Sequence, residues 1–265
     1  MAEGKFYNKV SLLEEVKRYK TSSQFLDLLY RELHGSKSLL LTGLGARLTA
    51  VTSSLTEELW GIDINQGSID RAEELMLTWD NIRSEEPLKT EDVFMEDRRL
   101  KPNFKNCHFY LKRDFPELKN YFDGELASEL FLHMDEAEIR EILNMANYRL
   151  KPNGKFIFTV YTSGQPDSLD REFHNLCSKY GMDGNEFIRD SVINIGKISK
   201  ILRTRNEIYE ENKDRYWLDL EKIRVFPEKE IEGMFVGSGL GKRYSKIIKC
   251  GMFPFAHRLV YVLEK

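Results

Sequence analysis

The chain has 265 residues, 41% of them hydrophobic, and a formal net charge of -3. This length suits one α/β domain spanning 1–265 with insertions better than two unrelated domains. The charge gives no overall electrostatic case for a nucleic acid or membrane partner. Cys107, Cys177 and Cys250 are widely scattered. With no secretory leader and no long apolar run, they predict a cytoplasmic protein without disulfides or a metal site.

The first 35 residues carry apolar side chains at helical spacing, with a break near Thr21 to Ser23. This spacing predicts two N-terminal helices over residues 1–35, packed ahead of the first strand.

Residues 38–65 read SLLLTGLGARLTAVTSSLTEELWGIDIN. The apolar run at Leu39 to Leu41 predicts a strand buried on both faces, and Gly43 and Gly45 follow it directly. Glycines at such a turn let a ligand approach the backbone, next to the unpaired N–H groups of a helix start. A second strand over Leu59 to Ile62 places Asp63 at its carboxyl end, where an acid can bind ribose hydroxyls. The order predicts a nucleoside-type ligand.

Asn65 is a natural N-cap for the helix expected over SIDRAEELMLTW. Residues 80–106 then lose all periodicity and are rich in charge, which predicts an exposed insertion. A short strand is expected at Cys107 to Leu111. A further strand is expected at Gly124 to Ser128.

Asp135 can cap a helix whose apolar stripe includes Ile139, Leu143, Ala146 and Leu150. Pro152, Asn153 and Gly154 are expected to end this helix and to turn the chain into the strand KFIFTVY. Alternating strands and helices predict a doubly wound, mostly parallel α/β sheet.

The last 40 residues predict a helix starting at Phe226-Pro227-Glu228 and then an antiparallel strand pair, YSKIIK and HRLVYVLEK, at the sheet edge. Residues 163–225 come between and predict a helical cap insertion. Its cations and aromatic residues either form a solvated amphipathic helix pair or a lid that holds an anionic or planar acceptor.

Over residues 36–162 and 226–265 the chain resembles the class I, Rossmann-like, S-adenosylmethionine-dependent methyltransferases. TGLGAR stands where that family has its glycine-rich first motif, GIDIN stands at its second strand, and RDF stands at its adenine-binding segment. The resemblance implies a seven-stranded sheet, S-adenosyl-L-methionine as cofactor and S-adenosyl-L-homocysteine as product. It implies that Asp63 binds ribose and that Asp114 and Phe115 hold adenine. The cofactor-binding residues that it implies are Thr42, Gly43, Gly45, Asp63, Ile64, Asp114, Phe115 and Glu129.

Two residues depart from the family's first motif. Leu41 stands where the family usually has an acid that helps to orient the methionine portion of the cofactor, and Arg47 replaces a third glycine. Arg47 either points outward at the helix start or contacts an anion of the cofactor or substrate.

Methyl transfer needs little acid or base chemistry, but an acceptor that carries a proton can require a base. His133, just past the fourth strand, is the first candidate, although it could equally cap the next helix. Glu129 could line the cofactor pocket or bind a substrate amine, and Tyr161, at the end of the fifth strand, could meet the acceptor. These three are the candidate catalytic residues.

A dehydrogenase also uses a glycine turn and a downstream acid, but its third glycine would fall at Leu48. We therefore favour methyl transfer to an O or N atom of a small molecule. The alternative is a non-catalytic binding or partner subunit with an altered cofactor site. An RNA or protein methyltransferase has less support, because no nucleic-acid module is evident. A homodimer is compatible with the sequence.

Overall fold

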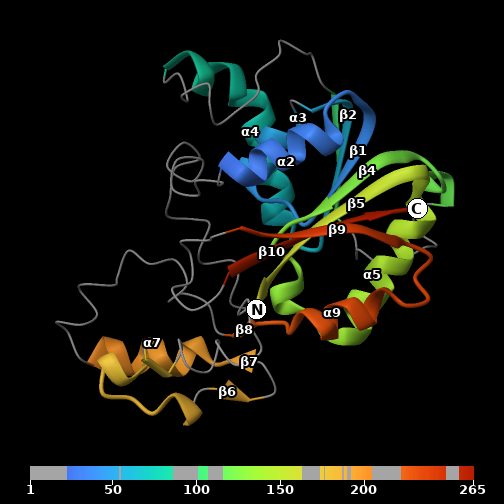
Figure 1. Cartoon of the computed structure of the whole chain (residues 1–265). Helices are drawn as coiled ribbons and strands as arrows, with labels where there is room; N and C mark the ends of the chain where they lie inside the picture. Colours follow the sequence, from blue (N-terminus) through green and yellow to red (C-terminus); the bar gives the residue numbers. More distant parts are fainter. Residues whose placement is uncertain are drawn as a thin grey trace.

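A computed structural model describes most of the chain, namely residues 23–53, 55–85, 101–106, 116–162, 174–175, 177–186, 188–189, 192–204, 222–248 and 257–265. Its centre is a seven-stranded sheet in the order β3-β2-β1-β4-β5-β10-β9 (Figure 1). The first five strands in the chain pair in parallel, and β10 is antiparallel to both of its neighbours. This confirms the predicted sheet and its C-terminal antiparallel pair. The strands are β1 (Ser36–Thr42), β2 (Thr56–Asp63), β3 (Lys101–Asn106), β4 (Phe122–Ala127), β5 (Leu150–Thr162), β9 (Gly241–Ile248) and β10 (His257–Glu264).

Helices cover both faces of this sheet (Figure 1). On one face, Leu39 and Ile157 pack in a cluster with residues of α2 (Ser23–Leu33), α3 (Ala46–Ser53) and α4 (Gln66–Glu85). On the other face, Leu40 and Phe156 pack with residues of α5 (Glu136–Arg149) and α9 (Glu228–Phe235). Strands covered on both faces need apolar side chains in both directions, which explains the continuous run in β1.

Residues 80–106 were expected to form an exposed insertion, but both ends of this range belong to regular secondary structure. α4 continues to Glu85, and β3 occupies Lys101–Asn106 in parallel register with β2. The third strand thus precedes the predicted one at Cys107 to Leu111, which lies outside the described residues. β3 is an edge strand, and charged side chains are common on such strands. Its Phe104 is the apolar anchor, at 9% exposed.

The junction between α5 and β5 also differs from the expectation. Asp135 forms the predicted capping box, accepting from Glu138 N at 2.9 Å. The helix ends at Arg149, however, and β5 already begins at Leu150. Pro152-Asn153-Gly154 therefore lies inside the strand, with Asn153 at φ 63°. Asparagine tolerates this left-handed conformation better than most residues do, so the strand can kink without ending.

The expected cap over residues 163–225 contains strands as well as a helix. The described parts form α7 (Ile195–Thr204) and a small sheet of β6 (Ile188–Arg189), β7 (Val192–Ile193) and β8 (Ile223–Arg224). The purely helical prediction is therefore incomplete, and residues 205–221 lie outside the described part. β8 contacts the short helix η5 (Phe131–His133). Phe226 N then donates to Tyr161 O at 2.8 Å, so the insertion returns to the carboxyl end of β5.

The two ends of the chain agree with the sequence where they are described. α2 is the second of the two expected N-terminal helices, and the first falls in residues 1–22, outside the described part. α9 follows Pro227, as predicted. In the described residues, no helix combines the length and the apolar character that crossing a membrane requires.

Candidate cofactor-binding site

The glycine turn after β1 has the conformation that its sequence predicts. Gly43 has φ 81° and donates its N–H to Ile62 O at 2.9 Å. Residues with a side chain rarely adopt this conformation. A Cβ at position 43 would also lie 3.3 Å from Leu130 Cδ1, so the loop after β4 packs on the turn. At Gly45 a Cβ would meet no described atom within 4 Å. Among the described residues, none fills the space beside this position.

Asp63 connects the end of β2 to the glycine turn. Its Oδ2 accepts the backbone N–H of Leu44 at 2.8 Å, and its Oδ1 accepts that of Asn65 at 2.8 Å. Asp63 as a residue is 8% exposed. Two charge-assisted hydrogen bonds therefore hold the acid at the mouth of the turn. Ile64 follows with its side chain 51% exposed, an apolar surface beside a buried acid.

Gly61 is a residue that the sequence analysis did not single out. A Cβ on Gly61 would lie 2.6 Å from Leu44 Cδ2 and 2.7 Å from Phe104 Cδ1. The missing side chain therefore makes room for Leu44, the middle residue of the glycine turn. A glycine inside a strand often marks such a close approach, and this was the available signal.

Leu41 and Thr42 both serve the interior. Leu41 is fully buried in the apolar cluster beneath α2 and α3, so this position offers no carboxylate to a ligand. Thr42 Oγ1 donates to Glu125 Oε1 at 2.8 Å, and Arg149 forms a buried ion pair with the same carboxylate at 2.6 Å. Because the Thr42 hydroxyl is bound to Glu125, only the backbone of Thr42 could contribute to the predicted cofactor site. Arg47 lies in the first turn of α3, and its side chain is outside the described part.

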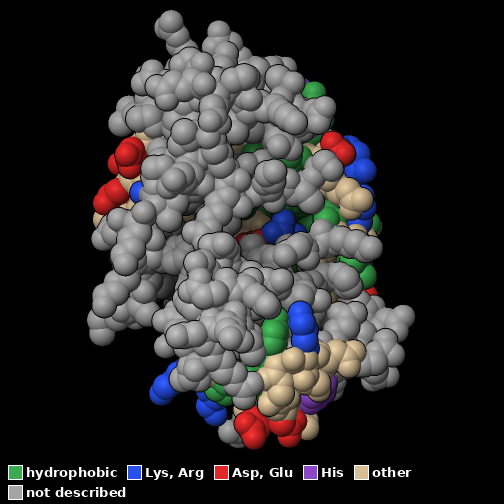
Figure 2. All heavy atoms as spheres, turned by 90° about the vertical axis from the view of Figure 1, so that its left-hand side faces the viewer, with side chains coloured by type: hydrophobic (Ala, Val, Ile, Leu, Met, Phe, Trp, Pro, Cys, Tyr) green, Lys and Arg blue, Asp and Glu red, His purple; other side chains and the backbone are tan. Residues whose placement is uncertain are grey.

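A second polar cluster joins the loop after β4 to the last residues of β5 and the start of β10. Glu129 has φ 61°, and its N–H donates to Thr159 Oγ1 at 2.8 Å. The Tyr161 hydroxyl donates to Glu129 Oε1 at 3.0 Å, and Arg258 Nη2 forms an ion pair with the same oxygen. Figure 2 views the molecule from the left-hand side of Figure 1, and Lys or Arg side chains are visible near the middle of this face. The structure thus brings Glu129 and Tyr161 together, as two of the three catalytic candidates.

Arg258 was missed by the sequence analysis. It is the register partner of Tyr161 across β5 and β10, so both side chains project from the same face of the sheet. Its guanidinium lies 5.4 Å from the centroid of the Phe25 ring. The signal was a charge at an inward position of the otherwise apolar strand RLVYVL.

The remaining predicted residues are only partly described. The backbone of His133 forms the end of η5, directly after the loop that carries Glu129, but its side chain is outside the described part. Asp114 and Phe115 also lie outside it. Their roles stay predictions.

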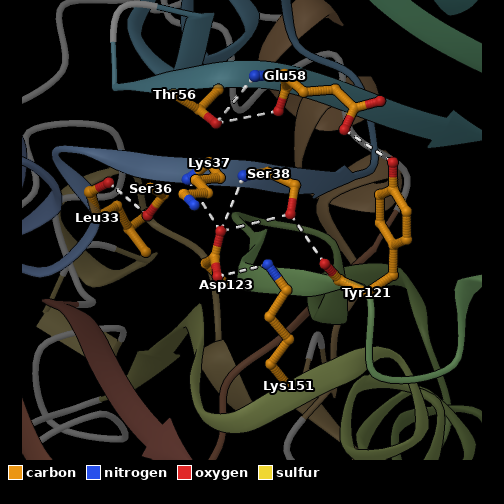
Figure 3. A network of polar contacts seen from close by, with 9 residues as sticks. All are labelled: Leu33, Ser36, Lys37, Ser38, Thr56, Glu58, Tyr121, Asp123 and Lys151. Carbon is orange, nitrogen blue, oxygen red and sulfur yellow. Dashed lines mark hydrogen bonds and ion pairs between the residues drawn. The ribbon is translucent and has the colours of Figure 1, made fainter.

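The opposite edge of the sheet, where the parallel strands begin, holds a different polar network (Figure 3). Asp123 Oδ2 accepts the backbone N–H groups of Lys37 and Ser38, each at 2.9 Å, and its Oδ1 accepts Lys151 Nζ at 2.7 Å. The Tyr121 hydroxyl donates to Glu58 Oε2 at 2.9 Å. Burial raises the pKa of Asp123, but the hydrogen bonds from Lys151 and Ser38 outweigh it and hold the pKa below its ordinary value.

Comparison with known proteins shows the fold. No protein-family model matches the chain, and a search of curated proteins finds no match. A SAM-dependent methyltransferase from Methanosarcina mazei is 13% identical with a TM-score of 0.57, over 90% of this chain and 96% of that one. The N-methyltransferase NodS from Bradyrhizobium japonicum WM9, solved with S-adenosyl-L-homocysteine, is 12% identical with a TM-score of 0.50, over 92% and 85%.

A structure from Rhodobacter sphaeroides named for Zn-dependent alcohol dehydrogenases is 11% identical with a TM-score of 0.59, over 94% of this chain and 91% of that one. At identities this low, the structural likeness shows a shared fold alone. This fold is the Rossmann-like α/β fold found in S-adenosylmethionine-dependent methyltransferases. Because the names differ in chemistry, the function must be argued from the site.

Proposed function

We propose that this protein is an S-adenosylmethionine-dependent methyltransferase that transfers a methyl group to an O or N atom of a small molecule. The observation that carries the proposal is the hydrogen bond from the Leu44 N–H to Asp63 at 2.8 Å, which joins the glycine turn to the acid at the end of β2. This joint lies at the carboxyl ends of the parallel strands, where α/β sheets bind their ligands.

The residues at this edge fit an adenosyl ligand. The open space at Gly45 lets a ligand approach the backbone, and Asp63 is a carboxylate suited to ribose hydroxyls. The exposed Ile64 side chain offers an apolar surface for a flat ring. The predicted roles of Asp114 and Phe115 at the adenine belong to the same proposal.

The cofactor supplies an activated methyl group, so the protein's task is to hold the acceptor in line in a water-poor pocket. We assign Tyr161 to the acceptor side through Glu129, because its fully buried hydroxyl donates to the Glu129 carboxylate, which is 27% exposed. His133 is the proposed base for an acceptor that must lose a proton. A small-molecule acceptor is supported by the insertion at 163–225. Its strand β8 contacts η5, which contains His133, and an insertion in this place suits a closed pocket.

Calorimetric titration of the full chain with S-adenosyl-L-methionine, S-adenosyl-L-homocysteine and NAD tests the proposal. Both adenosyl ligands should bind with a stoichiometry near one, and the dinucleotide should not. Binding of the dinucleotide alone would favour the dehydrogenase reading. The absence of binding by either adenosyl ligand would overturn the proposed function.

A second candidate, a non-catalytic binding or partner subunit, has one specific observation in its favour. Leu41 is fully buried among apolar residues, where the family usually has an acid for the methionine end of the cofactor. This candidate predicts that the protein binds neither adenosyl ligand or binds the adenosine portion alone. The same titration, with 5′-methylthioadenosine added as a ligand, separates the two candidates.

A further inference from the structure

The Glu129 carboxylate uses only one of its oxygens within the described part of the chain. Oε1 accepts from the Tyr161 hydroxyl at 3.0 Å and forms an ion pair with Arg258 Nη2. Oε2 has no hydrogen-bond donor among the residues that the structure describes. The Glu129 side chain is 27% exposed and that of Arg258 is 10% exposed, so the acid is the more accessible member of the pair. An ionised carboxylate only accepts hydrogen bonds, so a ligand at Oε2 must be a donor.

The partners of Glu129 place its carboxylate on the side of β4 that faces away from β1. The strands follow one another in the order β2-β1-β4-β5-β10 in this part of the sheet. Gly45 lies in the turn after β1, and Asp63 ends β2. Tyr161 belongs to β5 and Arg258 to β10, so the carboxylate extends from the loop after β4 toward these two strands. A ligand at Oε2 therefore lies beside the proposed adenosyl site and not within it.

Contacts within the protein hold the carboxylate in this direction. The N–H of Glu129 donates to Thr159 Oγ1 at 2.8 Å, and its backbone adopts φ 61°. Left-handed backbone at a residue with a side chain is costly and persists where surrounding contacts impose it. Arg258 is itself placed by the Phe25 ring, whose centroid lies 5.4 Å from the guanidinium carbon. Oε2 therefore has a fixed direction before any ligand binds.

We propose that the methyl acceptor is an amine, and that Glu129 Oε2 accepts a hydrogen bond from the nitrogen that is methylated. Tyr161 and Arg258 are the residues that position Glu129. This inference rests on the proposed function, because it requires S-adenosyl-L-methionine as the methyl donor. It commits to nitrogen where the proposed function allows either O or N.

An amine suits this carboxylate because of where the positive charge goes during the reaction. The neutral amine nitrogen uses its lone pair to form a bond to the methyl carbon, the bond between this carbon and sulfur breaks, and its electron pair stays on sulfur. The positive charge thereby moves from sulfur to nitrogen, and the product leaves as a methylated ammonium ion without the need for a base. A fixed carboxylate beside the nitrogen stabilises this charge as it develops. An alcohol would instead have to lose its proton.

Calorimetry on the full chain with three ligands tests the inference. Sinefungin has an ammonium group on a carbon atom in place of the sulfonium and its methyl group, so it presents N–H donors where the methyl group would be. S-adenosyl-L-methionine has the charge but no donor there, and S-adenosyl-L-homocysteine has neither. The wild type should bind sinefungin about tenfold tighter than S-adenosyl-L-methionine, the difference expected for one hydrogen bond between charged groups. Glu129→Gln should bring this ratio close to one.

Two variants of Arg258 separate positioning from folding. Arg258→Met should lower the ratio between sinefungin and S-adenosyl-L-methionine. Arg258→Lys should restore part of it, because the ammonium of lysine can still pair with Oε1. Glu136→Gln is the matched control, since Glu136 is an acid on α5 with a side chain 51% exposed. Its ratio should equal that of the wild type.

A wild-type ratio near one would show that Oε2 does not face the transferred methyl group, and it would overturn the inference. Equal weakening of both ligands by Glu129→Gln would leave the ratio unchanged, which shows a structural role and also overturns it. Failure of the proposed function has a different signature, because then the wild type binds none of the three ligands.

Discussion

Asp123 and Glu129 lie at opposite ends of the parallel strands and use their carboxylate oxygens differently. At the edge where the parallel strands begin, Asp123 accepts two backbone N–H groups on one oxygen and Lys151 on the other. Glu58 likewise has donors on both oxygens, Trp60 and Asn103 on Oε1 and Tyr121 on Oε2. At the edge where the strands end, Glu129 uses one oxygen within the described chain and presents the other outward.

Glu129 thus keeps one oxygen available to a ligand, whereas Asp63, also where the strands end, accepts a backbone N–H on each oxygen as part of the glycine turn. A buried polar group without a partner destabilises the protein, so acids of purely structural function have their hydrogen bonds satisfied internally. The network in Figure 3 meets this condition, and its acids join β1, β2 and β4 at their starts. Glu129 Oε2 falls outside this condition, because the Glu129 side chain is 27% exposed and its second oxygen is not a buried atom.

The largest expected effect concerns stability at the edge where the strands begin. Asp123→Asn removes the ion pair with Lys151 and leaves one carboxamide oxygen to serve the donors that two oxygens now serve. We expect a loss of about 3 kcal/mol in the free energy of unfolding, measured by urea denaturation. Affinity for S-adenosyl-L-homocysteine should stay within about twofold. A selective loss of ligand affinity would contradict the division between the edges.

The same substitution at the other edge should mainly affect ligand binding. Asp63→Asn turns an amide nitrogen toward the N–H of Leu44 or Asn65, so the glycine turn loses one of its two anchors. Because the charge for ribose hydroxyls is lost as well, affinity for S-adenosyl-L-homocysteine should fall about thirtyfold. Asp123→Asn is the matched control in the same calorimetric titration. Unchanged affinity in Asp63→Asn would remove Asp63 from the proposed site.

A third prediction concerns the pH dependence of stability at Glu32, an acid of α2 that pairs with Lys155 of β5. Burial raises the pKa of Glu32, but hydrogen bonds from Arg31, Lys155 and Tyr244 outweigh this and lower it from 4.5 to about 2. A lowered pKa contributes stability that is present above the ordinary value and is lost as the pH falls through the folded value. Glu32→Gln should therefore be less stable by about 1.5 kcal/mol near neutral pH, and this difference should shrink toward pH about 3. Urea denaturation across that range measures it, and a constant difference would contradict the assigned cause.

The sequence predicted most of the fold because its strongest patterns coincide with two-sided burial. The apolar run of β1 and the strand of Phe156 to Tyr161 are fully buried, and periodicity identifies such segments well. Asp135 formed its capping box as expected, since that bond depends only on neighbouring residues. β3 was not predicted within the charged stretch at 80–106 because it is an edge strand, held by Phe104 and by pairing with β2 rather than by its own pattern.

The site was predictable where it depends on local order along the chain. The glycine turn meets the end of β2, where Gly43 N donates to Ile62 O and Leu44 N donates to Asp63, while the roles of these residues toward a ligand stay predictions. Arg258 was not predictable in this way, because its pairing with Glu129 joins residues 129 positions apart in the sequence. The contact of Gly61 with Leu44 depends likewise on packing between strand and turn. Contacts of this kind follow from the register of the sheet, which the sequence alone did not give.

The smallest expected effect is the loss of stability when one hydroxyl, that of Tyr121, is removed. Tyr121→Phe removes the 2.9 Å hydrogen bond to Glu58 Oε2 but keeps the ring packed against Trp60. The hydrogen bond to Glu58 is the first cause of the raised pKa of Tyr121, and burial adds to it. Since Glu58 keeps its Trp60 and Asn103 donors, the loss should be about 1 kcal/mol in urea denaturation.

Tyr161→Phe removes the corresponding hydroxyl at the other edge, where Arg258 still holds Glu129. If Asp123 and Glu129 differ as argued, Tyr121→Phe changes unfolding alone, whereas Tyr161→Phe also weakens the binding of S-adenosyl-L-homocysteine in the calorimetric titration. The same response from both variants would show that the two edges are not functionally distinct.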